Sequence, residues 1–187
     1  MSNLLIILTV LSSFLANLAQ KTLQTDFVVS VSEDATQPMN YPGTITIHAQ
    51  RFVLTMYGLE AAYDGKTLYM YSANTDELTI SNPSEQELVS ANPFLYAETA
   101  TENSSITEHP SDDGLETIIT LTPNDLSAGI NRFTLRVRNA DLMPLHLEIK
   151  EGKKLSSLTL LNPAFIVTEP TYTIEPEGST FVNDLRF

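Results

Sequence analysis

The residues of this chain that could carry acid–base or metal chemistry are three histidines and two carboxylate pairs. His48, His109 and His146 lie far apart in the sequence, and the pairs Asp76-Glu77 and Asp112-Asp113 each fall in a turn context. Catalysis needs a base within reach of a nucleophile, or ligands at the spacing that a metal requires. We therefore expect solvated or hydrogen-bonded side chains here, with no catalytic residue, no metal site and no cofactor.

Known catalytic motifs are also missing from the sequence. It contains no G-x-S-x-G, no H-E-x-x-H, no P-loop and no cysteine for thiolate chemistry. The sequence therefore predicts a protein that is not an enzyme.

Composition and charge restrict the class of protein further. The chain has 187 residues, of which 42% are apolar and 18% charged, so it is long and apolar enough to form one folded domain. Its formal net charge is −13 at pH 7. Such a surface repels phosphate backbones and anionic lipid headgroups, so we expect neither nucleic-acid binding nor stable membrane insertion.

The first twenty residues contain no charged side chain. Their apolar run from Leu4 to Ala16 has the length of a signal-peptide core and is short for a membrane span. Ala19 before Gln20 is a plausible cleavage point, which would leave residues 20–187 as the mature domain. The alternative is that residues 1–19 form an N-terminal helix packed on that domain.

Period-two alternation of apolar and polar residues recurs from Asp26 onward. In NRFTLRVRN, Phe133, Leu135 and Val137 alternate with polar side chains, which is typical of a strand with one buried and one solvated face. We expect such strands at 26–32, 43–50, 51–58, after Gly65, and at 77–80, 115–123, 131–139, 144–152, 154–163 and 180–187. The short spacings between them predict an antiparallel meander of successive hairpins.

Local signals mark a hairpin and a helix within this pattern. Asp64-Gly65 predicts a tight turn, because glycine tolerates the positive φ that such a turn needs. Ser84 with Glu87 three residues later is a capping-box pattern that predicts a helix start. The apolar segment that follows, broken by Pro93, is expected to lie across the open sheet face. Residues 99–114 are polar and turn-rich and predict a flexible loop.

Apolar residues are abundant relative to the one short helix available to cover a curved sheet. Such a sheet can enclose more volume than its own side chains fill. Met56, Met70 and Met143 suit a space of that kind, because the unbranched thioether adapts to ligands of varying shape. The alternative is that they are ordinary core residues.

Several segments occur together in the order known from one protein family. Arg51-Phe52 precedes YDGKTLYMY (63–71), which is similar to S-D-G-K-T-L-W-x-Y. TLTPN (120–124) and NRFTLRV (131–137) are similar to an L-T-P block and the strand after it, and YTIEPEGSTFVND (172–184) to F-x-F-x-P-P-x-G-x-x-V-x-D. In this combination the chain resembles the LolA-type carriers of outer-membrane lipoproteins.

The resemblance implies a mainly β (α+β) fold, an unclosed antiparallel β-barrel with a short helical lid over its concave apolar face. It implies a monomeric periplasmic carrier of acylated lipoproteins, which are taken from an inner-membrane releasing transporter to an outer-membrane receptor. Under this hypothesis the acyl-chain cavity is lined by Phe52, Leu54, Met56, Leu68, Met70, Phe133, Leu135, Val137, Leu145 and Leu147. The lid is supplied by Leu88, Val89, Phe94 and Leu95.

One departure from the family concerns its switch arginine, which stands in an R-P-x-x-F context. This chain has His48-Ala49-Gln50-Arg51-Phe52 there, so Arg51 is close but displaced by one strand face or register. An arginine latch on the lid is therefore not implied for this chain.

Two other functions remain open from the sequence. The same half-barrel could sense or bind a lipid or lipoprotein without moving it between membranes. An enzyme acting on an envelope polymer would instead need two carboxylates, with Asp76 or Glu77 as one of them, about 5 to 10 Å apart in a polar groove.

Overall fold

The computed structural model describes residues 2–33, 37–126, 129–178 and 180–186, with the side chains of the first helix from Val10 onward. The helices are α1 (Ser2–Gln20), α2 (Glu85–Ala91), α3 (Phe94–Thr99) and the 3-10 helix η1 (Ala100–Asn103). The strands are β1 (Thr22–Glu33), β2 (Met39–His48), β3 (Arg51–Met56), β4 (Leu59–Tyr63), β5 (Leu68–Ser72), β6 (Glu77–Ser81), β7 (Ser104–Pro110), β8 (Glu116–Pro123), β9 (Ile130–Arg138), β10 (Pro144–Glu151), β11 (Lys154–Ile166) and β12 (Phe181–Asp184).

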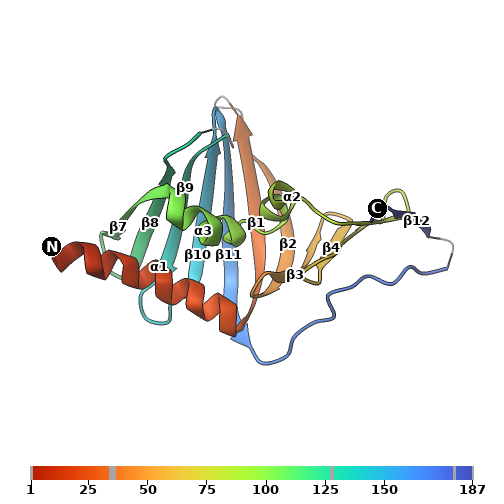
Figure 1. Ribbon diagram of the computed structural model, residues 1–187, viewed down its shortest axis with the longest axis horizontal. Helices are drawn as coiled ribbons and strands as arrows, with labels where there is room; N and C mark the ends of the chain where they lie inside the picture. Colours follow the sequence, from red (N-terminus) through yellow and green to blue (C-terminus); the bar gives the residue numbers. More distant parts are fainter. Residues whose placement is uncertain (1, 34–36, 127–128, 179, 187) are drawn as a thin grey trace.

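All of these strands belong to one sheet whose two edges do not meet. Their order is β12-β6-β5-β4-β3-β2-β1-β11-β10-β9-β8-β7, so β12 and β7 are the edges among the described residues (Figure 1). Every neighbouring pair is antiparallel except β12 with β6, which is parallel. The prediction of a mainly β, unclosed half-barrel with helical elements is confirmed.

Cross-strand register gathers the apolar side chains on one face of the sheet. Val29 of β1 lies opposite Leu158 of β11, which lies opposite Leu147 of β10, which lies opposite Leu135 of β9. Directly opposed residues in antiparallel strands point to the same face, so this row crosses four strands on one side. Period-two alternation repeats the row along each strand, and the concave face becomes apolar.

The long first helix covers one end of the concave face, as Figure 1 shows. Near β7 the backbone N–H of Leu11 donates to Oε1 of Glu108 at 3.4 Å. At the other end the N–H of Ala49, in the β2–β3 turn, donates to the carbonyl of Leu18 at 2.9 Å. Helix α1 therefore spans the sheet from its edge to its middle.

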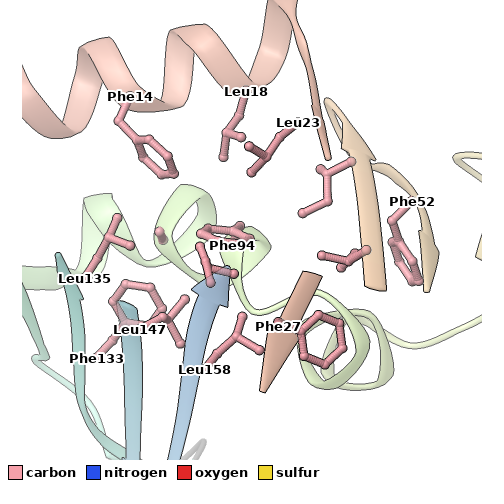
Figure 2. Close-up of a cluster of buried hydrophobic side chains, with 14 of the residues drawn as sticks. Phe14, Leu18, Leu23, Phe27, Phe52, Phe94, Phe133, Leu135, Leu147 and Leu158 are labelled. Carbon is pink, nitrogen blue, oxygen red and sulfur yellow. The ribbon is translucent and has the colours of Figure 1, made fainter. Parts of the chain in front are cut away.

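The core lies between α1, α3 and the concave face. Leu11, Phe14 and Leu18 of α1 are buried, and the Phe14 ring lies 5.9 Å from that of Phe94 on α3, centroid to centroid. Figure 2 shows Phe14 and Leu18 pointing toward the sheet, where Phe133 makes a ring contact with Tyr96 of α3. The two helices thus cover part of the concave face with the protein's own side chains.

Residues 2–20 form α1, and its buried side chains contribute directly to this core. The side chains of residues 4–9, part of the predicted apolar run, lie outside the described residues. Within the part of the chain that the structure describes, no helix is both long and apolar enough to cross a membrane. Cleavage after Ala19 stays a prediction.

Two predictions about the chain path are wrong. Residues 99–114 are not one loop, because they contain η1 and the edge strand β7. The sheet is also not a simple meander, because β1 pairs with β11 and β12 joins β6 in parallel. A parallel partner needs a long connection. Here the connection from β6 to β12 contains all the elements from α2 to β11, and its last part, residues 167–178, is called the C-terminal crossing segment.

Candidate functional site

A groove of about 220 Å³ lies between α2 and the concave face of the sheet. The side chains that line it from the sheet are apolar: Phe27, Val29, Ile45, Leu54, Met56, Leu147, Ile149 and Leu158. Helix α2 and the residues after it contribute Val89, Ser90, Ala91 and Pro93, and Ile130 completes the apolar wall. Glu151, Lys154, Ser156 and Ser157 also line it and are its polar side chains from the sheet.

The groove is large enough for part of an alkyl chain. It exceeds the cavity of roughly 150 Å³ that is known to hold a benzene ring, but it is smaller than the ~300 to 1,000 Å³ of most ligand pockets. A longer chain therefore requires α2 to move outward. None of the seven residues of α2 is buried, and only Leu88 and Ala91 pack against the core, so α2 is held less firmly than α3.

The start of α2 is fixed by a capping box, as the sequence predicts. The Ser84 hydroxyl accepts a hydrogen bond from the Glu87 N–H at 3.3 Å, and Glu87 Oε2 accepts one from the Ser84 N–H at 2.7 Å. These hydrogen bonds hold the pKa of Glu87 below its usual range. The helix is thus stabilised locally at its N-terminus.

A break at Pro93 separates α2 from α3. The N–H of Asn92 donates to the carbonyl of Leu88 at 2.7 Å, and Asn92 Oδ1 accepts from the N–H of Phe94 at 3.2 Å. Asn92 is fully buried, whereas the residues of α2 before it are not. The predicted lid is therefore two units, a loosely packed α2 and a core-bound α3.

A second cavity of about 390 Å³ adjoins the groove. The two share Val89 and Ser90 of α2 and Ile130 and Glu151 of the sheet as lining residues. The remaining walls of the second cavity are mostly polar and come from α2, α3, η1 and the β8–β9 connection. The apolar groove thus adjoins a chamber whose wall also carries several polar and charged side chains.

Most of the predicted cavity residues share the concave face, but only some of them line the groove. Leu54, Met56 and Leu147 do, and so does Val89 of the predicted lid. Leu54 and Met56 are opposite Ile45 and Gly43 of β2. These residues lie near the centre of the sheet. Among the described residues that line the groove, α2 is the helix that covers them.

Other predicted cavity residues belong to the closed core. Phe133, Leu135 and Val137 are fully buried, and the Phe133 ring lies 5.5 Å from that of Tyr96 on α3. Phe52 and Leu68 are also buried without lining the groove.

Two predicted residues stand apart for different reasons. Met70 is in register with Ala61 on the concave side but is 38% exposed, because it lies toward the uncovered end of the sheet. Leu145 sits at an irregularity between Pro144 and His146 and is half-buried. Neither lines the groove.

The predicted lid residues divide between the two helices. Leu88 and Val89 of α2 are half-buried, and Leu88 packs against the core cluster. Phe94 and Leu95 of α3 are buried within the core. Of these four residues, only Leu88 and Val89 lie on α2, the helix that is loosely packed.

Sequence reasoning missed the groove residues Phe27, Val29, Ile45, Ile149 and Leu158. All of them occupy apolar positions of strands that the alternation predicts. Their strands were recognisable, but β1 and β11 are distant in sequence and adjacent in space. The pairing of β1 with β11 is the long-range contact that brings Phe27, Val29 and Leu158 to the groove.

Arg51 contacts the C-terminal crossing segment. Its Nη2 lies 2.9 Å from Glu169 Oε2, and its Cζ lies 4.6 Å from the centroid of the Tyr172 ring. Nε2 of His48 is 3.4 Å from the other oxygen of Glu169. Through these contacts Arg51 holds the C-terminal crossing segment against the β2–β3 turn.

Several of the histidines and carboxylates considered for catalysis make structural hydrogen bonds. His146 Nδ1 lies 3.1 Å from the Thr159 hydroxyl, and Asp76 Oδ1 accepts from the Thr180 hydroxyl at 2.9 Å. Among the residues in the described ranges, no group of three or more potential ligands could hold a metal ion. That the chain is not an enzyme stays a prediction.

No protein-family model and no curated protein matches the chain. Among solved structures, an uncharacterized conserved protein from Thermus thermophilus matches with a TM-score of 0.61 at 14% identity, over 93% of this chain and 96% of that chain. A LolA superfamily protein from Nitrosomonas europaea matches with a TM-score of 0.44 at 11% identity, over 88% and 94%. Lipoprotein LppX from Mycobacterium tuberculosis matches with a TM-score of 0.43 at 13% identity, over 86% and 97%.

At these identities the likeness concerns the fold alone. The resemblance to LolA-type carriers therefore concerns the fold and not the role of the protein.

Proposed function

We propose that this protein is a carrier that sequesters acyl chains reversibly in the groove beneath α2. The observation that supports it most directly is the groove itself, an apolar space bounded by the sheet on one side and by a helix without buried residues on the other. No covalent step is involved. The LolA-type sequence resemblance makes acylated lipoproteins the cargo, moved through the periplasm from the inner to the outer membrane.

The energetics favour a temporary binding site. Each buried methylene contributes roughly 0.8 kcal/mol, so an alkyl chain inserted along the groove gains several kcal/mol. Admitting the rest of the chain requires α2 to move outward, which offsets part of that gain. A carrier must bind its cargo less tightly than the final acceptor does, and a small groove under a movable helix satisfies this requirement.

Filling the groove tests the proposal. Ser156 lies opposite Val31 and Ile149 in register and lines the groove, so Ser156→Phe places a ring inside it. We expect this variant to lose binding of a fluorescent fatty acid by tenfold or more at an unchanged unfolding midpoint. The control is Thr159→Phe, on the same strand but exposed. Equal binding by both variants would contradict a site beneath α2.

Cellular depletion separates a carrier from a sensor. Loss of a carrier should leave acylated lipoproteins in the inner membrane, measured by membrane fractionation and mass spectrometry. Loss of a sensing module should leave their distribution unchanged and alter signalling only. Material purified from the native envelope should also carry lipid or lipoprotein, and its complete absence would count against both.

A further inference from the structure

The cavity beside the groove has several acidic side chains in its wall. Three carboxylates line it, Glu85 of α2, Asp125 of the β8–β9 connection and Glu151 at the end of β10. Among the lining residues of both cavities, one side chain is basic, Lys154, whose Nζ lies 3.2 Å from Glu151 Oε2. Three carboxylates and one ammonium leave a net charge of −2 around the connected space.

Two further features of this cavity suit a polar ligand. Tyr96 lines it and presents an aromatic side chain, whose face attracts cations. Ser104, also in the wall, adds a second hydroxyl-bearing side chain, which lies beside the Tyr96 hydroxyl.

The two cavities share part of their walls, and the groove is the more apolar of the two. Val89 and Ile130 lie at their boundary, so an alkyl chain in the groove places its polar end in the carboxylate-lined chamber. We propose that this chamber is a headgroup site that selects amphiphiles with a positively charged end over those with an anionic end. The inference rests on the proposed function, since it requires the tail to occupy the groove.

Electrostatics set the expected size of the preference. Two unit charges 4 Å apart interact by about 1 kcal/mol in water and by about 4 kcal/mol near a protein surface. The chamber opens to solvent, so the lower part of that range applies. The expected discrimination between a cationic and an anionic headgroup on the same tail is therefore about tenfold.

The test compares three ligands that share a dodecyl tail: dodecyltrimethylammonium, a dodecyl octaethylene glycol ether and dodecyl sulfate. Each is titrated below its micellar concentration against full-length protein loaded with the neutral fluorophore N-phenyl-1-naphthylamine. We expect the ammonium compound to displace the fluorophore at about tenfold lower concentration than the sulfate, with the neutral ether between them.

A pair of charge-matched variants locates the preference. Glu85→Gln with Asp125→Asn changes two exposed carboxylates of the chamber, whereas Glu60→Gln with Glu175→Gln changes two exposed carboxylates that do not line it. Both pairs alter the net charge equally. The chamber pair should reduce the preference to about twofold, and the control pair should leave it at about tenfold.

The outcomes distinguish the two proposals. If all three ligands displace the fluorophore equally, or the sulfate displaces it best, the headgroup site is wrong while acyl binding stands. A preference that falls equally in both variant pairs would reflect net charge and would also overturn the site. If no ligand displaces the fluorophore, the proposed function fails and the headgroup site fails with it.

Discussion

The guanidinium carbon of Arg51 lies 4.6 Å from the centroid of the Tyr172 ring. This contact joins the start of β3 to a segment more than a hundred residues later in the chain. Tyr172 is 7% exposed, and Glu169 lies 2.9 Å from the same guanidinium. The segment that carries them leads to the edge strand β12 (Figure 1). The contacts of Arg51 with Glu169 and Tyr172 therefore help to hold the segment that leads to β12.

Tyr172→Ala should release the C-terminal crossing segment. Removing a buried aromatic side chain costs roughly 3 kcal/mol or more, and here it also removes the surface on which Arg51 rests. Arg51→Ala should cost about 1 kcal/mol, since exposed ion pairs and cation–π contacts are individually weak. Hydrogen exchange over residues 167–178 measures both effects.

A surface ion pair elsewhere supplies the control for these variants. Arg138 binds Asp141 through two nitrogens, at 2.9 and 2.7 Å, and does not touch the C-terminal crossing segment. Arg138→Ala should leave exchange in that segment unchanged. Equal exchange in Tyr172→Ala and in the wild type would show that these contacts do not hold the segment.

Phe14→Ala should destabilise the whole domain. The side chain is fully buried against Phe94, and deleting a buried phenylalanine typically costs about 3 to 5 kcal/mol. Ser12 lies on the exposed face of the same helix, so Ser12→Ala should stay within about 0.5 kcal/mol of the wild type. Urea denaturation compares the two variants.

Helix α1 also gives a direct prediction for a shortened protein. A chain that starts at Gln20 lacks Leu11, Phe14 and Leu18, so the core residues beneath them become exposed. We expect it to bind a hydrophobic dye and to unfold at a lower urea concentration than the full chain. If the shortened protein is equally stable, α1 is dispensable for folding.

Glu108 should make α1 docking dependent on pH. Burial raises the pKa of Glu108, and the hydrogen bond from the Leu11 N–H offsets this only in part. The folded protein then binds the proton more tightly than the unfolded chain does, so this group adds stability as the pH falls through its folded pKa toward the unfolded value. At neutral pH its charge is a penalty.

Glu108→Gln removes that penalty and keeps an oxygen that can accept from Leu11. We expect the variant to be more stable than the wild type at pH 7.5, with a difference that shrinks as the pH approaches the usual carboxyl value of about 4.3. Urea titrations at several pH values provide the measurement, with exposed Glu102→Gln as control. A difference that is the same at every pH would rule out this titration.

Ser84→Ala should loosen α2 without unfolding the domain. It removes the acceptor for the Glu87 N–H, and losing an N-cap costs about 1 kcal/mol. Because no α2 residue is fully buried and only Leu88 and Ala91 pack against the core, packing compensates only in part. We expect faster hydrogen exchange at residues 85–88, faster release of a bound fatty acid and a free energy of unfolding that is lower by about 1 kcal/mol, which leaves the domain folded.

Glu87, the second residue of the capping box, gives a milder variant for comparison with Ser84→Ala and a dependence on pH. Glu87→Gln should weaken the cap less than Ser84→Ala, since the serine hydroxyl remains. Because hydrogen bonds lower the pKa of Glu87, its contribution is complete above the unfolded pKa and is lost as the pH falls through the folded value. Fatty-acid release that is slowed by either variant would contradict the proposed role of α2.

Gly43→Ala should deform the groove. A Cβ at this position would lie 2.5 Å from Cζ of Phe27 and 2.6 Å from the carbonyl oxygen of Thr55. The carbonyl oxygen belongs to the backbone of β3 and cannot rotate away, so we expect a loss of roughly 1 to 3 kcal/mol and weaker fatty-acid binding. Thr44→Ala, at an exposed neighbouring position, should change neither quantity.

The fold class followed from the sequence because one-sided strands carry a local pattern. Alternation in β9 and the Ser84–Glu87 capping box depend only on residues within a few positions of one another. Strand β7 could not be recognised in this way, because Ser105, Thr107 and His109 are exposed and Ile106 is its main apolar residue. An edge strand of this kind resembles a polar loop.

The site was only partly predictable, for a different reason. Which apolar residues are covered by the protein itself and which remain free for a ligand depends on where α1 and α3 pack. Phe133 and Leu54 have equivalent positions in their strands, yet Phe133 meets Tyr96 while Leu54 faces the groove. No local pattern distinguishes them, because the difference comes from long-range packing.

The parallel pairing of β12 with β6 has a consequence for biosynthesis. Strand β6 ends at residue 81, but the strand that satisfies its outer backbone groups begins at residue 181. During translation about a hundred residues must therefore be made while this edge stays open to pairing with other chains. A chain that is released before its last residues are made would be nearly complete but would expose the unpaired edge of β6. Protection by chaperones should therefore matter most while the last residues are being made.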